Sequence, residues 1–297
     1  MINICIMFVA LSIIAMVLYN TITTNSTLNI GVFTYNTIWN GMLNDPKNSG
    51  SLDGTKCMID GTNRCQEGMI ERIHHYFNDK NIQFVCLQEC PVILTSKILN
   101  GFQNTWNALP HRKARGMITF YRKDSNITYF PEDSIHGFFV NDKPYGERPF
   151  IVEHFNVSDI PTMLINVHPG HPGYGDYTYF DKHIWEEIKK NPILKQIWVN
   201  KKSAKLIAGD WNSVLYSKDL TFGGIRFVGE NKAQQDTCCA SSTIWPSKKW
   251  KPNASFDNIL CSNNMKVVSR IRDMKGKQPY RSDHIGVVGV SSIIYSY

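Results

Sequence analysis

No lysine or arginine precedes Lys47 in this chain, and the segment 2–19 contains no charged side chain. That segment is apolar except for Asn3 and Ser12. Its length lies between the core of a signal peptide and the roughly 20 residues that cross a bilayer, so a cleaved signal peptide and an uncleaved membrane anchor are both open. The absence of a small-x-small cleavage site after it favours an anchor, and the absence of basic residues leaves the positive-inside rule little to act on. We expect residues 1–20 to lie outside the folded domain.

Cysteine pairs with Cys-x-x-Cys spacing are also absent, which argues against a structural zinc site. Cys57 and Cys65 enclose a polar, glycine-containing loop that a disulfide could close, and Cys238 and Cys239 are adjacent in another polar stretch. Because seven cysteines lie outside the N-terminal segment, at least one has no partner within the chain. Cys86 lies in an apolar run and is expected to be a small core residue.

Four Asn-x-Ser/Thr sequons accompany the apolar N-terminal segment, at Asn25, Asn126, Asn156 and Asn253. Such sequons are glycosylation acceptors in proteins that pass through the secretory pathway. The two features together predict a secreted or membrane-anchored protein whose domain is extracellular or luminal.

The rest of the chain contains no repeat, low-complexity tract or linker that would separate two domains. We therefore expect one domain over residues 28–297, a length that can bury a sizeable core. The formal net charge is +7 and the sequence pI is about 8.9. This surplus favours an anionic partner, either nucleic acid or an acidic membrane surface, with improved solubility as the other interpretation.

Hydrophobic patterns alternate between strands and helices from residue 30 onward. Apolar residues at helical spacing predict helices at 66–80, 179–191 and 192–202. Strands are predicted at 29–36, 82–89, 116–123, 148–157, 161–168, 204–210, 255–262 and 284–290. We expect 148–157 and 161–168 to pair antiparallel. Strands gathered in both halves of the chain, with few helices between them, predict two sheets packed face to face with helices outside, an α/β sandwich.

Polar residues of catalytic type recur where these strands end. In LIAGDWNSVL, Gly209 lets the backbone turn so that Asp210 and Asn212 emerge together at the rim of a sheet, with a plain Asx-type turn as the other interpretation. The complete set comprises Asn36, Glu89, His168, Asp210, Asn212, Asp257, Asp283 and His284. Each has an ordinary structural interpretation by itself, but together they are the inventory of a Mg²⁺-dependent phosphoester hydrolase.

Phosphoester chemistry explains the first of these residue types. Breaking a P–O bond requires a hard cation that neutralises charge on the phosphoryl oxygens. Mg²⁺ prefers one or two carboxylates and leaves its other positions to water and substrate, and Glu89 is the best candidate ligand. Mn²⁺ and Ca²⁺ are the alternative cations.

The remaining residue types fit the attack of water. A water molecule needs a base, and His284, oriented by Asp257 or Asp283, can take its proton. Negative charge that develops around the phosphorus needs hydrogen-bond donors, a role that suits His168 and Asn212, and also Asn36.

These motifs, taken in order, resemble the endonuclease/exonuclease/phosphatase superfamily, the DNase I-like proteins. The resemblance covers about residues 30 to 290 and rests on the motifs YN, LQE, GMITFYRK, ERPF, NVH, GDWN, FDNIL and SDH. It implies a four-layered α/β sandwich of two packed mixed β-sheets with outer helices, and a site at one edge.

The resemblance also implies roles for individual residues. Glu89 would bind Mg²⁺, Asn36 would help to bind metal or phosphate, and Asp210 and Asn212 would orient the nucleophile and the phosphate. His168 would be one of the two histidines that flank the scissile phosphate.

The second histidine would be His284, supported by Asp257, with Asp283 as a further acid on the metal side. Arg148 matches a phosphate-contacting arginine of deoxyribonuclease-like members, with a surface salt bridge as the alternative.

Two departures from the family pattern narrow what the resemblance implies. The segment before GMITFYRK is PHRKARG, which is basic where many members carry the acid that orients the first histidine, so the acid partner of His168 cannot be named. The Trp-Cys-Asp-Arg segment of the inositol-phosphatase branch is replaced by SFDNIL, which argues against phosphoinositide specificity.

Basic residues concentrate around the motifs and bear on the substrate. Arg115 is a candidate phosphate contact, and the set comprises Arg112, Lys113, Arg115, Lys248, Lys249, Lys251, Arg270, Arg272, Lys275, Lys277 and Arg281. They favour a nuclease acting on nucleic acid. Trp245 and Trp250 could instead enter a bilayer interface, so a sphingomyelinase-like or inositol-phosphate phosphoesterase remains an alternative. A binding module that has lost turnover is a third, against which the intact polar set argues.

Overall fold

The computed structural model describes eleven stretches of the chain: 25–37, 58–59, 62–63, 65–111, 116–124, 126–139, 148–170, 181–212, 219–229, 257–272 and 286–296. Several predictions from the sequence concern residues outside these ranges, and they stay predictions. They concern the N-terminal segment 1–20, Cys57, Cys238, Cys239, Arg115, Trp245, Trp250, Asn253, Asp283 and His284. Among the described residues no helix is long and apolar enough to cross a membrane.

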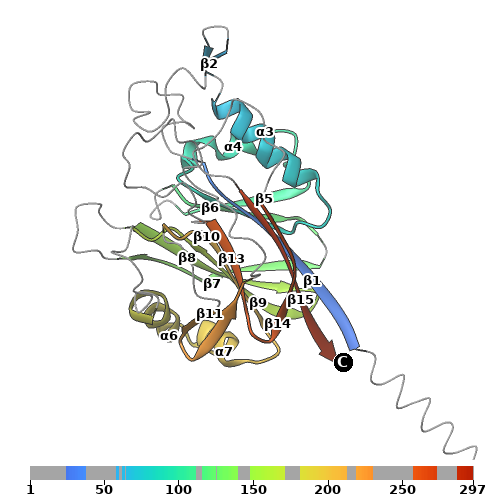
Figure 1. Cartoon of the computed structure of the whole chain (residues 1–297), viewed down its shortest axis with the longest axis vertical. Helices are drawn as coiled ribbons and strands as arrows, with labels where there is room; N and C mark the ends of the chain where they lie inside the picture. Colours follow the sequence, from blue (N-terminus) through green and yellow to red (C-terminus); the bar gives the residue numbers. More distant parts are fainter. Residues whose placement is uncertain are drawn as a thin grey trace, which may run out of the picture.

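The first of two large sheets contains the start and the end of the described chain. Its strands are β1 (Asn25–Asn36), β4 (Phe84–Gln88), β5 (Trp106–Pro110), β6 (Ile118–Arg122), β14 (Met265–Arg272) and β15 (Val287–Ser296). Their order is β14-β15-β1-β4-β6-β5. β1 is parallel to β4 and antiparallel to β15, so Asn36 lies beside Gln88 and Asn25 lies beside Ser296. The C-terminus is therefore next to the start of β1 (Figure 1).

The second sheet is built around a parallel pair. Its strands are β7 (Ile127–Phe139), β8 (Arg148–Val157), β9 (Ile160–Val167), β10 (Ala204–Asp210), β11 (Asp219–Phe222), β12 (Ile225–Val228) and β13 (Asp257–Ser262). Their order is β11-β12-β13-β10-β9-β8-β7, and β9 and β10 run parallel. β8 and β9 pair antiparallel, which confirms the predicted hairpin. A small separate hairpin joins β2 (Met58–Ile59) to β3 (Thr62–Asn63).

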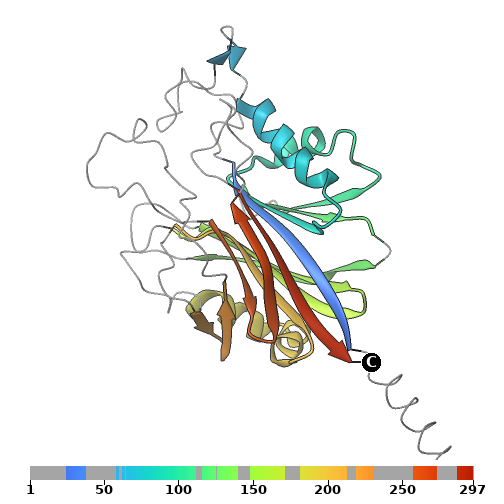
Figure 2. The ribbon, with the colours of Figure 1, turned by 45° about the vertical axis from the view of Figure 1, so that its right-hand side comes forward.

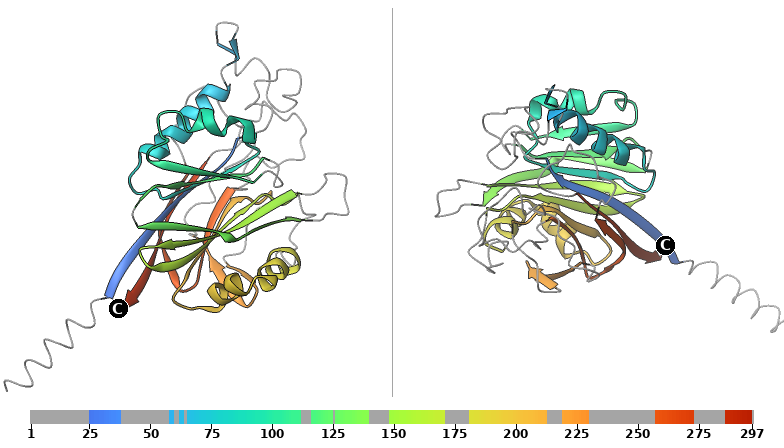
Figure 3. Two further views of the ribbon diagram at one scale, coloured as in Figure 1. Left: turned by 180° about the vertical axis from the view of Figure 1, so that it is seen from behind. Right: turned by 45° about the horizontal axis from the view of Figure 1, so that its top comes forward.

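Helices cover the outer face of each large sheet. α3 (Cys65–Asn78), η1 (Val92–Leu94) and α4 (Thr95–Ile98) pack on the first sheet. The π-helical turn η2 (Asp181–Trp185), α6 (Glu186–Lys190) and α7 (Pro192–Val199) pack on the second. Figure 3 shows the resulting order of helices, sheet, sheet, helices. The predicted four-layered α/β sandwich is confirmed.

Local sequence explains the helices that close the two outer layers. α3 buries Met69, Ile73 and Phe77 on one face, and this four-residue spacing keeps them on one side of the helix. The Phe77 ring stacks on the Trp106 ring of β5, with centroids 4.5 Å apart. α7 begins where the Asn191 side chain accepts hydrogen bonds from two backbone N–H groups, with Pro192 in its first turn, the residues preferred at those positions.

Besides the apolar contacts between each sheet and its helices, an apolar cluster fills the space between the two sheets. It includes Val32, Phe84, Phe155, Leu164 and Leu206, all of which are fully buried. These residues come from both sheets, so the sandwich is held together by direct burial of apolar surface on the two inner faces. Cys86 is buried in the same cluster as a free cysteine, which confirms its predicted role in the core.

Candidate active site

The carboxyl ends of four strands meet at one edge of the sandwich. β1 and β4 end there from the first sheet, with Asn36 opposite Gln88. β9 and β10 end there from the second sheet, with Gly209 opposite Val167. Because the strands of each pair are parallel, the residues that end them or follow them directly lie at the same edge.

His168 joins the two sheets at this edge. Its Nε2 atom lies 3.5 Å from Glu89 Oε1 and 3.5 Å from Asp210 Oδ2. The side-chain amide of Asn36 donates a hydrogen bond of 2.8 Å to the same Oδ2 atom of Asp210. His168, Asp210 and Asn36 are buried, whereas the Glu89 side chain is 27% exposed. The structure thus brings Asn36, Glu89, His168 and Asp210 together, and the acids beside His168 are Glu89 and Asp210.

Asp210 and Asn212 form a turn that is also part of the site. The Asp210 Oδ1 atom accepts a hydrogen bond of 2.8 Å from the backbone N–H of Asn212, which is an Asx-type turn. The Asn212 side-chain amide donates to the carbonyl oxygen of Pro169, also at 2.8 Å. The turn interpretation is therefore confirmed, and the two hydrogen bonds hold Asp210 beside His168 and Asn212 against Pro169.

Arg148 and Asp257 lie at the margins of this group. Arg148 begins β8, and its Nη1 atom is 3.5 Å from Glu89 Oε1. The Arg148 side chain is 30% exposed, and its contact with Glu89 is the salt bridge that the sequence left open as an alternative. Asp257 begins β13, pairs in register with Asp210, and is fully buried.

Backbone geometry explains how side chains from neighbouring strands come so close. A Cβ atom on Gly209 would collide with the carbonyl oxygen of Val167, so only glycine lets β10 approach β9 just before Asp210. Glu89 and Asn212 have φ angles of 53° and 47°, in the left-handed region that is unfavourable for most side chains. Both residues are held in strained conformations at the site, a pattern that is typical of functional positions.

A buried polar bridge behind the site was not anticipated from the sequence. The Gln88 side chain donates 2.7 Å to Asn166 Oδ1 and 3.1 Å to Thr34 Oγ1. The Asn166 amide lies 3.4 Å from the hydroxyl of Thr119. Gln88 precedes Glu89, and Asn166 is two residues before His168, so the bridge fixes the two strand ends that carry the site. Its signal in the sequence is a polar residue inside an apolar strand, in VCLQ and LINV.

Cys90 follows Glu89 directly and is fully buried. Burial raises the pKa of its thiol to about 12, so it is a neutral thiol at physiological pH and a poor nucleophile. The nucleophile of any hydrolysis at this edge must come from elsewhere.

Three predicted site residues, Arg115, Asp283 and His284, lie outside the described residues. The strand that follows His284 in the chain is β15, and its first residue, Val287, pairs with Thr34 of β1. Thr34 is two residues before Asn36.

The strand ends supply oxygen donors of the kind that a hard divalent cation requires. Glu89 Oε1 and Asp210 Oδ2 share one neighbour at 3.5 Å each, so they are at most twice that distance apart. No three His, Cys, Asp or Glu side chains within the described stretches are grouped tightly enough to hold a metal by themselves. Mg²⁺ needs only one or two carboxylates in addition to water and substrate oxygens, and this set of carboxylate and amide oxygens fits that requirement.

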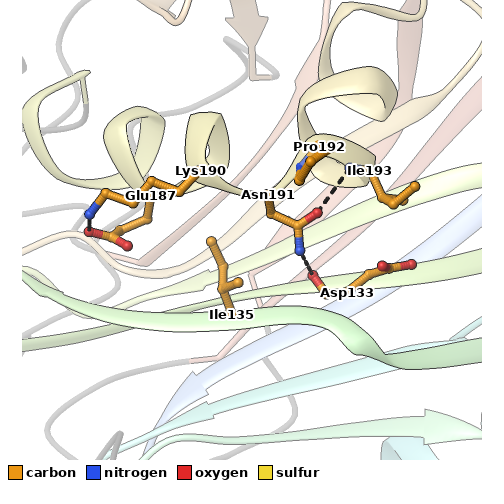
Figure 4. Close-up of a pocket in the computed structure, with 7 residues that line it drawn as sticks. All are labelled: Asp133, Ile135, Glu187, Lys190, Asn191, Pro192 and Ile193. Atoms are coloured by element: carbon orange, nitrogen blue, oxygen red, sulfur yellow. Dashed lines mark hydrogen bonds and ion pairs between the residues drawn. The ribbon is translucent and has the colours of Figure 1, made fainter.

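A surface hollow of about 580 Å³ lies elsewhere in the molecule, between β7 and the helices α6 and α7 (Figure 4). It is lined by Asp133, Ile135, Glu187, Lys190, Asn191, Pro192 and Ile193. Glu187 and Lys190 pair with each other across its rim. None of the predicted site residues lines this hollow.

Solved structures with the same architecture identify the fold. A crystal structure of an endonuclease/exonuclease/phosphatase from Bacteroides vulgatus matches with a TM-score of 0.62 and 15% identity, over 89% of this chain and 98% of that one. The fold is the endonuclease/exonuclease/phosphatase fold. TDP2 from C. elegans matches with a TM-score of 0.56 and 12% identity, over 89% of this chain and 75% of that one.

A further endonuclease/exonuclease/phosphatase family protein, from Leptotrichia buccalis, matches with a TM-score of 0.55 and 13% identity, over 90% and 99% of the two chains. No protein-family model and no curated protein matches the sequence. The endonuclease/exonuclease/phosphatase fold predicted from the ordered motifs is therefore confirmed by the structure, at sequence identities that show the fold alone.

Proposed function

We propose that this protein is a Mg²⁺-dependent phosphoester hydrolase, and more narrowly a secreted or membrane-tethered nuclease that cleaves phosphodiester bonds in nucleic acid with a His-activated water. One observation carries the proposal: carboxylates from the two sheets, Glu89 and Asp210, meet at a single imidazole nitrogen of His168. Such a cluster, at the edge where strands of both sheets end, can serve an anionic substrate only if a cation balances its charge.

Glu89 is the proposed cation ligand, assisted by Asn36 and Asp283. Its exposed fraction of 27% leaves its carboxylate open to a hydrated ion, whereas Asp210 is almost completely buried. When bound, Mg²⁺ neutralises charge on the phosphoryl oxygens and lets a water approach the phosphorus. Arg148, 3.5 Å from Glu89, adds a second positive charge on the same side.

His284 is the proposed general base, oriented by Asp257 or Asp283. It takes a proton from the attacking water as a new bond forms between the water oxygen and phosphorus and the bond from phosphorus to the leaving oxygen breaks. Asp210 and Asn212 orient the nucleophile and the phosphate, because hydrogen bonds fix both side chains: Asp210 accepts from the backbone N–H of Asn212, and the Asn212 amide donates to the carbonyl oxygen of Pro169. His168, which lies beside both carboxylates, is the proposed donor to the negative charge that develops on the phosphoryl group.

Nucleic acid is the proposed substrate because of charge. The chain carries 32 Lys and Arg against 25 Asp and Glu, and the basic runs that flank the motifs, including Arg115, suit contacts to successive phosphates. The names of the structural neighbours, endonuclease/exonuclease/phosphatase, agree with a phosphoester substrate.

The test uses the full chain in detergent with three substrates: plasmid DNA, sphingomyelin micelles and a soluble inositol phosphate. Each is incubated with Mg²⁺ or with EDTA. We expect plasmid cleavage that depends on Mg²⁺ and that is lost in His284→Ala and Glu89→Gln. Cleavage that survives His284→Ala would refute the mechanism, and turnover of the lipid or the inositol phosphate alone would refute the nucleic-acid substrate.

Matched controls separate chemistry from folding. Glu186→Gln changes an exposed carboxylate on α6, and His75→Ala changes an exposed histidine on α3. Both are expected to cleave plasmid at the parent rate. A protein that is folded by circular dichroism but turns over none of the three substrates would show that the domain is a binding module.

A further inference from the structure

β1 separates the candidate site from the start of the domain by its full length. The strand contains 12 residues, from Asn25 to Asn36. At about 3.3 Å per residue these ends lie roughly 36 Å apart. Asn36 contacts Asp210 at the site, and Asn25 pairs with Ser296 at the other end. Figure 2 shows β1 and β15 lying side by side along this length, with the C-terminus beside the start of β1.

The apolar segment joins the domain at the end away from the site. Only residues 20–24 lie between Tyr19, the last residue of the apolar run, and Asn25. The peptide units from Tyr19 to Asn25 span at most about 21 Å in any conformation. This reach is shorter than the length of β1. A bilayer that holds the segment 2–19 is therefore tied to the end of the molecule opposite the strand ends that carry Glu89, His168 and Asp210.

The direction of the strands adds to this argument. Asn36, Glu89, His168 and Asp210 all end or directly follow strands that run away from the segment's end of the molecule. For this edge to face the bilayer, the start of β1 would have to be the part of the domain farthest from the membrane. The short connection forbids that arrangement.

Exposed side chains at the opposite end suit the neighbourhood of lipid headgroups. Val199 and Ile294 are each 65% exposed there; Val199 ends α7 just before β10, and Ile294 lies near the end of β15, opposite Thr27 of β1. Lys201 and Lys202 are also exposed, in the turn after α7. Apolar side chains next to lysines are typical of surfaces near a membrane interface, although the turn after β8 adds one exposed acid, Asp159.

We infer that the uncleaved N-terminal segment holds the domain on a bilayer with the candidate site facing away from it, so that the substrate is a soluble phosphodiester and not a lipid of the same membrane. The inference rests on the proposed function and narrows its substrate class. It decides against the sphingomyelinase-like alternative on grounds of access, independently of the basic charge.

Orientation is tested without any measurement of activity. A fluorescent amino acid is introduced at Thr27, which is exposed near the start of β1, or at Ile93, which is 80% exposed four residues after Glu89. Each full-length chain is reconstituted in phosphatidylcholine–sphingomyelin vesicles that contain an acceptor-labelled lipid. We expect a larger loss of donor emission at Thr27 than at Ile93. An equal or larger loss at Ile93 would overturn the inference, as would failure of the chain to float with the vesicles.

Substrate access is tested on the same vesicles. Oligonucleotide added outside should be cleaved at the rate seen in detergent, and the sphingomyelin of the bilayer should remain intact. Hydrolysis of that sphingomyelin would overturn the inference. Failure of the proposed function looks different: the oligonucleotide would stay intact in detergent as well, while the emission losses at Thr27 and Ile93 would keep their order.

Discussion

The two sheets contribute different chemistry to the same site. The six-stranded sheet supplies Asn36 and Glu89, oxygen donors of which the second is partly exposed. The seven-stranded sheet supplies the buried His168 and Asp210, an imidazole and a carboxylate. Neither sheet holds a complete set. The site therefore depends on how the sheets pack, and it is disturbed by changes that shift one sheet relative to the other.

The largest expected effect comes from removing one carboxylate from each sheet. Glu89→Gln and Asp210→Asn should each lower kcat for oligonucleotide cleavage by a factor of about 10² to 10⁴, because the first removes the proposed cation ligand and the second removes a carboxylate that orients the nucleophile. If the two sheets form one functional unit, the double variant should lose little more than either single variant. Losses that multiply fully in the double variant would indicate two independent contributions.

A smaller effect is expected where the sheets are bridged. Gln88→Leu removes the donor to Asn166 and Thr34 and leaves buried acceptors without their partner. This should lower the free energy of unfolding by about 1–3 kcal/mol and reduce activity by displacing Glu89 relative to His168. Urea denaturation and steady-state kinetics measure the two losses. Gln103→Leu, at an exposed glutamine, is the matched control, and equal behaviour of the two variants would contradict the bridge.

Within the second sheet alone, Lys205 should affect stability without affecting activity. Its Nζ atom donates to the carbonyl oxygen of Asn200 at 2.7 Å and to the hydroxyl of Ser203 at 2.7 Å, and burial lowers its pKa to about 8. Lys205→Met should cost about 1–3 kcal/mol of unfolding free energy and leave kcat unchanged, because Lys205 lies at the start of β10 and Asp210 at its end. The control Lys201→Met, in the exposed turn, should leave both the unfolding free energy and kcat unchanged.

The smallest expected effect is a change of stability with pH, and it comes from Glu153, which is buried inside the sandwich. Burial raises the pKa of Glu153, while His111, whose Nε2 atom lies 3.3 Å away, lowers it in part. A carboxyl with a raised pKa in the folded state contributes stability that is complete below its ordinary pKa near 4.5 and is lost as pH rises through the folded-state value.

As pH rises from 4 toward neutrality, the parent should therefore lose unfolding free energy relative to Glu153→Gln. The loss should reach about 1.4 kcal/mol for each unit by which the pKa of Glu153 is raised. Urea denaturation across that range checks it, with the exposed Glu132→Gln as control. If the unfolding free energies of the parent and of Glu153→Gln changed with pH in the same way, the predicted effect of Glu153 on stability would be wrong.

The strands that form the site could be predicted from the sequence because they are continuously apolar and end in polar residues. β8 and β10 have the predicted bounds, 148–157 and 204–210. β7 was missed because it is an edge strand with many half-exposed positions, and Pro131 and a register shift between Phe130 and Ile135 interrupt its pattern. Proline and irregular register are tolerated at such an edge, so the pattern there carries little information.

The partners within the site were harder to predict than its members. The motifs named Glu89, His168 and Asp210, but the acids beside His168 come from β4 and β10, strands of different sheets. Sheet packing decides that contact, and spacing along the chain contains no record of it. The bridge through Gln88 was missed for the same reason, because its partners lie 54 and 78 residues away.

The positive φ angles of Glu89 and Asn212 have a consequence for protein engineering. Glycine at either position would relieve a backbone cost of about 1 kcal/mol or more, most of all at Glu89, since asparagine tolerates this region better. If Glu89 and Asn212 act as proposed, a directed-evolution campaign that screens only for heat resistance would be drawn toward inactive variants, and such a library should be sorted on turnover as well as on melting temperature.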